Sequence, residues 1–313
     1  MDEARWEPEM PSRQEMPGLE HYKKLDHLSC SSCSKAARCR RLYFYSCGCR
    51  LVRGVEHCAL KFGEAIHTAL GPAQRGDLDE ALDGFARVWG VTQGDDSRNP
   101  LRAKTLLREF IRTHTPRTYE IIPPPKTVEI EDRVSPDEIP FVLDLGLEVP
   151  IVGRVDAHCQ NIHNKQRWVV EYKTGRSLGE FYFQNFLLAP QTFTYPLALQ
   201  VLTGEPYQGV ILEGLQTCKT KAETQAFPIY VGPSSYVDIV RWYQEIYRQI
   251  KDCEESGWWP KNLGCCAPYS AFGQPGYVCD YKDLCLVEDW TTAMCLFERR
   301  DHEIFKVKKE TQP

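Results

Sequence analysis

The sequence predicts an α/β protein built as one domain with helical additions. The chain has 313 residues, of which 42% are hydrophobic, enough to enclose one sizeable core. Short apolar runs between turn residues are typical of strands, and longer segments with capping residues and helical periodicity are typical of helices. We expect the domain to cover residues 25–300, between a flexible tail at 1–24 and a second tail at 301–313.

Capping residues mark several helices. A Ser-rich cap opens the helical segment 29–46, and Asp77 has a capping-box-like spacing to Glu80 before a helix that ends near Val88. Asn99-Pro100 provides an N-cap with Pro at N1 for a helix to Thr113. We expect further helices at 59–70, 178–188, 190–202 and 234–256, the last with Val240, Tyr243, Tyr247 and Ile250 on its buried stripe. The segment 71–115 carries no recognisable chemistry, and we expect it to form a helical insert.

Apolar runs also predict strands beyond the centre of the chain, at 118–122, 127–131, 141–147, 207–215 and 225–231. Glu120, Glu129 and Glu131 lie on the first two of these strands. Any of the three could supplement a metal site, although carboxylates on the exposed face of a strand are commoner.

The stretch 149–176 is the one around which the chain is organised. Two apolar runs, 151–155 and 168–170, flank the polar segment 160–167, which is the pattern of an antiparallel hairpin with a loop at its tip. Because side chains alternate along a strand, Glu171 and Lys173 share one face and Tyr172 points away. If the strands pair, Asp156 approaches the same face.

Two carboxylates and an ammonium group at the end of an apolar strand require partners. Their burial is unfavourable unless the charges are paired or hold a cation. Asp156 and Glu171 offer the hard oxygen ligands that suit Mg²⁺ or Mn²⁺. Lys173 would orient or activate a water and offset charge on a phosphate. The alternative is a surface hairpin with ordinary charged residues, since similar tripeptides occur by chance, as at 280–282.

Four short motifs occur in a recognisable order. Gly153-Arg154-Val155-Asp156 precedes the run Val-Val-Glu-Tyr-Lys-Thr-Gly at 169–175. Upstream lies a Gly-x-x-x-His motif that ends at His67, and downstream a Gln-x-x-x-Tyr motif joins Gln191 to Tyr195. Together, over roughly residues 28–290, they resemble the PD-(D/E)XK nuclease superfamily and specifically its RecB-like exonuclease branch. The chain is similar to the exonucleases of CRISPR adaptation and to AddB-type nuclease domains.

The resemblance implies a restriction-endonuclease-like core, with a central mixed β-sheet flanked by helices. It also implies a metal-dependent DNA exonuclease that acts in recombination, repair or DNA processing. The implied catalytic residues are Asp156, Glu171, Lys173, Gln191 and Tyr195, and the implied metal ligands are His67, Asp156 and Glu171. Pro196, directly after Tyr195, should kink its helix or lie in the first turn. The alternatives are a nuclease-fold DNA-binding or scaffold protein without catalysis, and a structural iron–sulfur or zinc protein.

The 14 cysteines point to metal binding rather than to disulfides, because the N-terminus has no export signal. Several RecB-like nucleases hold a 4Fe–4S cluster with one N-terminal and three C-terminal cysteines. The resemblance assigns that role to Cys39, Cys266, Cys279 and Cys285, with Cys265 as an alternative to Cys266. The segment between Cys266 and Cys279 is longer than in those relatives. A zinc site with four thiolates, which Cys30 and Cys33 could join, and unligated buried thiols are the alternatives.

Charge and hydropathy bound the possible partners. The net charge of −5 does not by itself indicate nucleic-acid binding, but basic residues can still line a groove. The segment between His27 and Val55 has no acidic residue and holds six Lys and Arg, which form either a solvated face or a phosphate-contacting one. Without an apolar run of the ~18 residues that span a bilayer, we expect no membrane contact, an intracellular, cytoplasmic location and DNA as the partner. The sequence does not indicate an oligomeric state.

Overall fold

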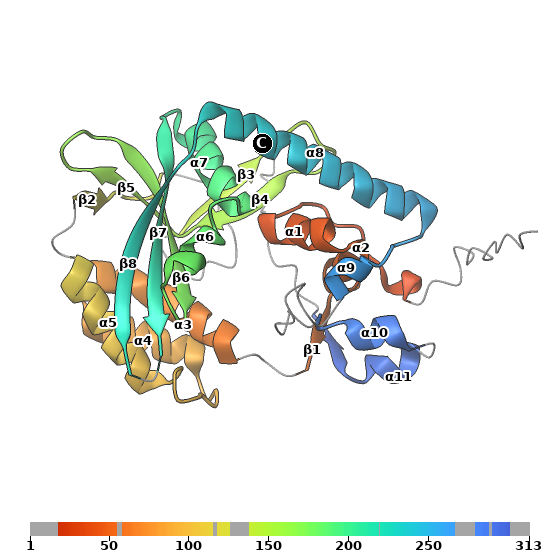
Figure 1. Cartoon of the computed structure of the whole chain (residues 1–313), viewed down its shortest axis with the longest axis horizontal. Helices are drawn as coiled ribbons and strands as arrows, with labels where there is room; N and C mark the ends of the chain where they lie inside the picture. Colours follow the sequence, from red (N-terminus) through yellow and green to blue (C-terminus); the bar gives the residue numbers. More distant parts are fainter. Residues whose placement is uncertain are drawn as a thin grey trace, which may run out of the picture. The chain divides into compact units, whose positions relative to one another are not determined.

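Figure 1 shows the computed structural model, which describes residues 18–54, 58–114, 118–125, 138–218, 220–266, 279–287 and 290–300. The chain divides into two units. The terminal unit combines Met1–Gly54 with Trp242–His302, and the central unit combines Val55–Arg241 with Glu303–Pro313. The domain boundaries expected from the sequence stay predictions. The predicted strand 127–131, with Glu129 and Glu131, lies outside the described residues.

A mixed sheet of five strands forms the middle of the central unit. The strands lie in the order β2-β5-β6-β7-β8. Strands β6 and β7 run parallel, and the other neighbouring pairs are antiparallel. Their bounds are Tyr119–Ile121 for β2, Ala157–Asn161 for β5, Arg167–Gly175 for β6, Tyr207–Thr217 for β7 and Ala222–Tyr230 for β8. The expected α/β class with a central mixed sheet is therefore confirmed.

The central hairpin differs from the sequence prediction in its first strand. The run Ile151–Val155 (β4) pairs antiparallel with β3 (Ile139–Leu143) in a separate two-stranded sheet. The partner of β6 is β5, with Ala157 opposite Val170 and Cys159 opposite Trp168. The chain bends at residue 156, so the pairing with β6 begins only after the bend. The predicted hairpin assigned the wrong partner to β6. The chain offers two consecutive strand-like runs before β6, and tertiary packing favours the second.

Three helices cover one face of the sheet (Figure 1): α3 (Cys58–Gln74), α4 (Leu78–Trp89) and α5 (Pro100–His114). Their N-termini follow the sequence signals. Asp77 Oδ1 accepts a hydrogen bond from Glu80 N at 2.9 Å, and Asn99 Oδ1 accepts one from Arg102 N at 3.0 Å. Rings of Phe62, Phe85 and Trp89 pack edge-on or stacked at 5.6–5.7 Å within the shared core. The segment expected as an insert thus belongs to the main core.

The opposite face carries α6 (Glu180–Gln184) and α7 (Pro190–Thr203). Buried Leu178 and Phe183 pack there against Leu212 and Ile229. Helix α7 contacts β7 and β3 and ends at Thr203, and its C-cap is Gly204, whose φ of 71° suits glycine. These two helical segments follow β6 directly, so residues on that face of β6 lie beside them.

The terminal unit is held by an aromatic core in which Trp259 contacts Tyr43 and Phe44, with centroids 5.8 and 5.5 Å away. Helix α8 (Pro233–Ser256) has residues in both units, and its buried stripe is Ile239, Tyr243, Ile246 and Ile250, shifted from the predicted one. The other elements are a 3₁₀ turn Leu19–His21, α1 (Cys30–Arg38), α2 (Arg40–Tyr43), a π-helical turn Phe44–Gly48, β1 (Leu51–Arg53), α9 (Leu263–Cys266), α10 (Lys282–Leu286), α11 (Trp290–Met294) and β9 (Phe297–Arg299). Strands β1 and β9 pair antiparallel.

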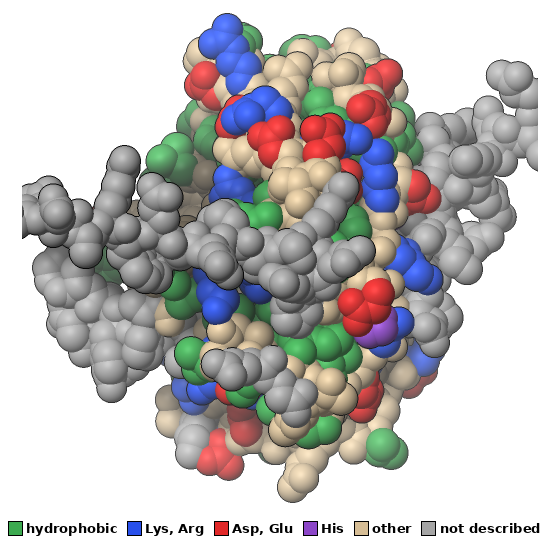
Figure 2. Space-filling model, turned by 90° about the vertical axis from the view of Figure 1, so that its right-hand side faces the viewer, with side chains coloured by type: hydrophobic (Ala, Val, Ile, Leu, Met, Phe, Trp, Pro, Cys, Tyr) green, Lys and Arg blue, Asp and Glu red, His purple; other side chains and the backbone are tan. Residues whose placement is uncertain are grey.

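Two basic residues of the acid-free segment have structural partners in the terminal unit. Arg41 is 5% exposed and its Nε donates to Trp259 O at 2.6 Å, and Arg53 forms an ion pair with Asp283. Figure 2 shows Lys and Arg side chains intermixed with Asp and Glu on one face of the molecule. Among the described residues, no helix combines the length and apolarity that a bilayer crossing demands.

Replacing Gly153 by Ala should destabilise the protein by about 1–3 kcal/mol, because a Cβ there would lie 2.5 Å from Phe141 Cζ. The Phe141 ring packs against Tyr195, so the displacement would spread toward α7. Urea unfolding of the variant measures the loss. Gly232→Ala is the matched control, since a Cβ at Gly232 meets nothing within 4 Å. Equal stability of the two variants would contradict this packing.

Candidate active site

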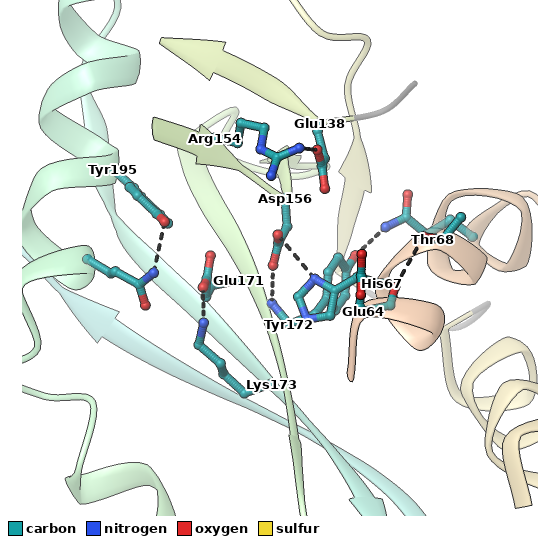
Figure 3. Close-up of polar contacts among 12 residues, drawn as sticks. Glu64, His67, Thr68, Glu138, Arg154, Asp156, Glu171, Tyr172, Lys173 and Tyr195 are labelled. Carbon is teal, nitrogen blue, oxygen red and sulfur yellow. Dashed lines mark hydrogen bonds and ion pairs between the residues drawn. The ribbon is translucent and has the colours of Figure 1, made fainter. Parts of the chain in front are cut away.

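Asp156 joins three elements of the central unit. It lies at the bend between β4 and β5, and its Oδ2 accepts a hydrogen bond from the backbone N–H of Tyr172 on β6 at 2.8 Å. Its Oδ1 lies 3.3 Å from Nδ1 of His67, which α3 contributes. The carboxylate side chain is 16% exposed. Figure 3 shows the His67 ring and the Tyr172 backbone approaching this carboxylate together.

Glu171 and Lys173 form the second pair of the site. Both lie on β6 and point to the same face, as the alternation of a strand requires. Lys173 Nζ contacts Glu171 Oε1, and the Glu171 side chain is only 7% exposed. Its other oxygen, Oε2, is buried and has no hydrogen-bond partner among the described residues. A buried carboxylate oxygen in this state is unfavourable and marks a place where a cation would be stabilising.

The four titratable side chains alter one another's pKa values. Burial, followed by the negative charge of Asp156, raises the pKa of Glu171 to about 7. Burial would also raise the pKa of Asp156, but the charge and hydrogen bond of His67 outweigh burial and lower it. Burial opposes the charged forms of Lys173 and His67, yet the neighbouring carboxylates raise both of their pKa values. Asp156 is therefore the permanent anion, and Glu171 is the carboxylate that exchanges a proton near neutral pH.

Gln191 and Tyr195 lie one turn apart on α7, as the sequence predicted. Gln191 Nε2 donates to Tyr195 Oη at 2.9 Å, and the Tyr195 ring packs edge-on against Phe141 at 5.8 Å. Pro190, not Pro196, occupies the first turn of the helix, and Pro196 lies within it. In the view of Figure 3, Tyr195 lies on the side of Glu171 away from His67.

Sequence reasoning missed residues that surround these side chains. Glu138 is buried, forms an ion pair with Arg154 at 3.2 Å and lines a small pocket with His67 and Asp156. The register of β3 with β4 brings it there, since Ile139 faces Val155. In the sequence, the only indication that Glu138 belongs to the site is its position directly before an apolar strand. Glu120, which was considered as a further ligand, instead lies on edge strand β2 with a side chain that is 55% exposed, 4.0 Å from Lys165.

The four cysteines assigned to a cluster all belong to the terminal unit. Burial raises the pKa values of Cys266, Cys279 and Cys285, the last to about 11. Neighbouring thiols raise these pKa values further: Cys39 acts on Cys266 and Cys279, and Cys266 acts on Cys279 and Cys285. The thiols thus lie within electrostatic range of one another. Cys30 and Cys33 have other neighbours: Cys30 Sγ lies 2.9 Å from Tyr243 Oη, and the pKa of Cys33 is raised by burial, then by Cys30 and Cys47.

The family model of the PD-(D/E)XK nuclease superfamily matches residues 27–285. The chain belongs to this nuclease superfamily. A search of curated proteins finds no match. Among solved structures, one titled "Crystal structure of SSO0001" shares 13% sequence identity, with 78% of this chain and 89% of that chain covered. Its TM-score is 0.33, so this likeness bears on neither fold nor activity.

PD-(D/E)XK nucleases use divalent metals, and the donor set at the carboxylates fits such an ion. Asp156 and Glu171 offer hard carboxylate oxygens within electrostatic range of each other, and Glu171 Oε2 has no hydrogen-bond partner among the described residues. In the part of the chain that the structure describes, no three His, Cys, Asp or Glu side chains are grouped closely enough to hold a metal ion. Among these side chains, His67 contacts Asp156 and Lys173 contacts Glu171.

Glu171→Gln should remove a pH dependence of stability in metal-free protein. The pKa of Glu171 in the folded state, about 7, lies above its ordinary value of 4.5. Between these values the folded state keeps a proton that the unfolded state has lost, so wild-type stability falls as the pH rises through this window. We expect the wild type to lose on the order of 2–3 kcal/mol relative to the variant.

Urea unfolding with EDTA, at about pH 5 and about pH 8, measures this difference on both sides of the window. Glu223→Gln, at a side chain that is 44% exposed, is the control and should follow the wild type. Parallel stability curves for the wild type and Glu171→Gln would show that Glu171 is not the group that keeps the proton.

Proposed function

We propose that this protein is a divalent-metal-dependent DNA exonuclease of the RecB-like branch, acting in DNA recombination, repair or processing. One observation carries the proposal: the buried carboxylate of Glu171 and the partly buried carboxylate of Asp156 act on each other electrostatically, and Lys173 contacts Glu171. Two carboxylates that can hold a divalent ion beside a cationic side chain suit metal-assisted hydrolysis of a phosphodiester. Membership of the PD-(D/E)XK superfamily supports nuclease chemistry at this place.

Each side chain of the site would have a separate role. Asp156 and Glu171 would hold Mg²⁺ or Mn²⁺, with His67 as a third ligand or as the residue that orients Asp156. The bound ion would supply Lewis-acid stabilisation of charge on the phosphate. Lys173, which contacts Glu171, would orient or activate the attacking water and offset charge on the phosphate.

Two contacts support the RecB-like branch in particular. His67, from the upstream helix, lies against Asp156, and Gln191 and Tyr195 contact each other on the helix that follows the catalytic strand. Both pairs match the motifs that the resemblance rests on. We propose that Gln191 and Tyr195 contact the phosphate backbone beside the scissile bond, because their amide and hydroxyl groups are suited to that role.

We further propose that Cys39, Cys266, Cys279 and Cys285 hold a 4Fe–4S cluster, with zinc as the alternative and Cys265 as a substitute for Cys266. The mutual influence of these thiols supports the proposal. Cationic side chains, Lys261 and Arg41 near Cys285 and Arg38 near Cys279, oppose the rise in thiol pKa and favour thiolates. The role would be structural, within the terminal unit.

Lys173→Ala should abolish cleavage while DNA binding persists. The ammonium group acts in the chemical step, whereas affinity comes mainly from phosphate contacts elsewhere. We expect cleavage of labelled DNA with Mn²⁺ to fall by on the order of 1,000-fold or more, with anisotropy-measured affinity close to that of the wild type. Lys221→Ala, at a side chain that is 57% exposed, is the matched control. Unchanged turnover in Lys173→Ala would refute the assignment.

Anaerobically purified protein should contain iron and acid-labile sulfide, or zinc, at the cysteine site. Cys279→Ser and Cys285→Ser should lose this metal, unfold at lower temperature and lose activity indirectly, because ligation stabilises the fold. Cys295→Ser, at an exposed cysteine of the same unit, should retain the metal. Wild-type protein that is folded and active with neither metal would leave these four as ordinary thiols.

A further inference from the structure

Tyr172 contacts both members of the His67–Asp156 pair, although its side chain lies on the face of β6 opposite to Glu171 and Lys173. Its backbone N–H donates to Asp156 Oδ2 at 2.8 Å. Its ring packs edge-on against the His67 ring, with the two centroids 6.4 Å apart and an angle of 86° between the planes. Figure 3 shows the three residues together. The side chain of Tyr172 is therefore placed to influence how His67 meets Asp156.

A hydrogen bond from α3 holds the phenol group of Tyr172. The donor is Nε2 of Gln74, the last residue of the helix, and the acceptor is Tyr172 Oη. Gln74 and His67 lie seven residues apart within α3, which is two helical turns, so both fall on the same side of the helix. This hydrogen bond ties the last turn of α3 to β6, on the side of the helix from which His67 reaches Asp156.

The side chains around His67 are closely packed. His67, Gln74, Asp156 and Tyr172 line one small cavity of about 10 Å³. Such a cavity offers space for no more than about one water molecule. The Tyr172 ring is 2% exposed and also packs edge-on against Phe110, with centroids 5.9 Å apart. A shift of this ring would therefore displace its neighbours, because there is little empty space to accommodate it.

We propose that Gln74 is a positioning residue, which acts through its hydrogen bond to Tyr172 to fix the His67 ring in the orientation that contacts Asp156. The role rests on the proposed function, in which His67 and Asp156 belong to the divalent-metal site. A side chain that is already oriented when the ion arrives loses less conformational freedom on binding it. Groups that orient metal ligands from outside typically change metal affinity by roughly 10–100-fold. In this role Gln74 contributes no ligand atom.

Mn²⁺ binding by the full-length protein, followed by electron paramagnetic resonance of the free ion, tests this role. Tyr172→Phe keeps the ring and the backbone N–H but removes the hydroxyl group, and Gln74→Met keeps a similar volume but removes the amide. Each variant should raise Kd for Mn²⁺ about tenfold. The double variant should raise it no further, because both substitutions break the same hydrogen bond. Urea unfolding establishes that each variant is folded under the conditions of the binding measurement.

A His67→Ala background separates positioning from a general loosening of the fold. Tyr172→Phe should leave Kd for Mn²⁺ unchanged in this background, because the side chain that Tyr172 positions is gone. Thr68→Ala is the matched control: the hydroxyl group of Thr68 donates to Glu64 O of the same helix at 3.1 Å, and this variant should bind Mn²⁺ as the wild type does. Wild-type affinity in both Tyr172→Phe and Gln74→Met, or an equal loss with and without His67, would overturn the role.

A measurement on metal-free protein distinguishes this role from the proposed function. The nitrogen NMR signals of the His67 imidazole report its contact with Asp156, so Gln74→Met should shift them and Thr68→Ala should not. Unchanged signals in Gln74→Met would overturn the positioning role by themselves. Failure of the proposed function reads differently: the signals would shift in Gln74→Met, which supports the positioning of His67, but wild-type protein would bind no Mn²⁺ and release no nucleotides from DNA.

Discussion

The contacts of two carboxylates, Asp156 and Glu171, with His67 and Lys173 are the interaction on which the central unit depends. Asp156 connects α3, through His67, to β6, through the backbone N–H of Tyr172. It does so from the bend at which the chain leaves one sheet for the other. Removing one partner of such a set leaves an uncompensated buried charge, which is far more unfavourable than losing the pair. The site therefore also fixes the junction of the two sheets.

The same pairing prepares the unit for its proposed chemistry. The side chains of Lys173 and His67 are each 25% exposed, whereas the Glu171 side chain is 7% exposed. Glu171 is placed by β6, and Asp156 lies at the bend, where it accepts a hydrogen bond from Tyr172 N. Metal binding would replace the contacts of Lys173 and His67 with contacts to the ion.

Local rules predicted much of this arrangement, and long-range pairing decided the rest. Strand alternation placed Glu171 and Lys173 together and Tyr172 on the opposite face, and capping residues located the helix starts at Asp77 and Asn99. The strand partner of β6 could not be predicted, because both candidate runs have a strand-like pattern and only packing against α3–α5 favours the second. Glu138 was missed for a related reason: the register of β3 with β4, which no local signal sets, brings it to the site.

The most direct measurement is the release of acid-soluble nucleotides from end-labelled DNA by the full-length protein, with Mn²⁺ and then with excess EDTA. The proposed site predicts release that depends on Mn²⁺, stops on chelation, resumes when the ion is restored and is lost in Asp156→Asn, which removes the permanent anion of the site. Absence of release with Mg²⁺ or Mn²⁺ by folded, DNA-binding protein, or release that persists in EDTA, would contradict a metal-dependent nuclease at Asp156 and Glu171.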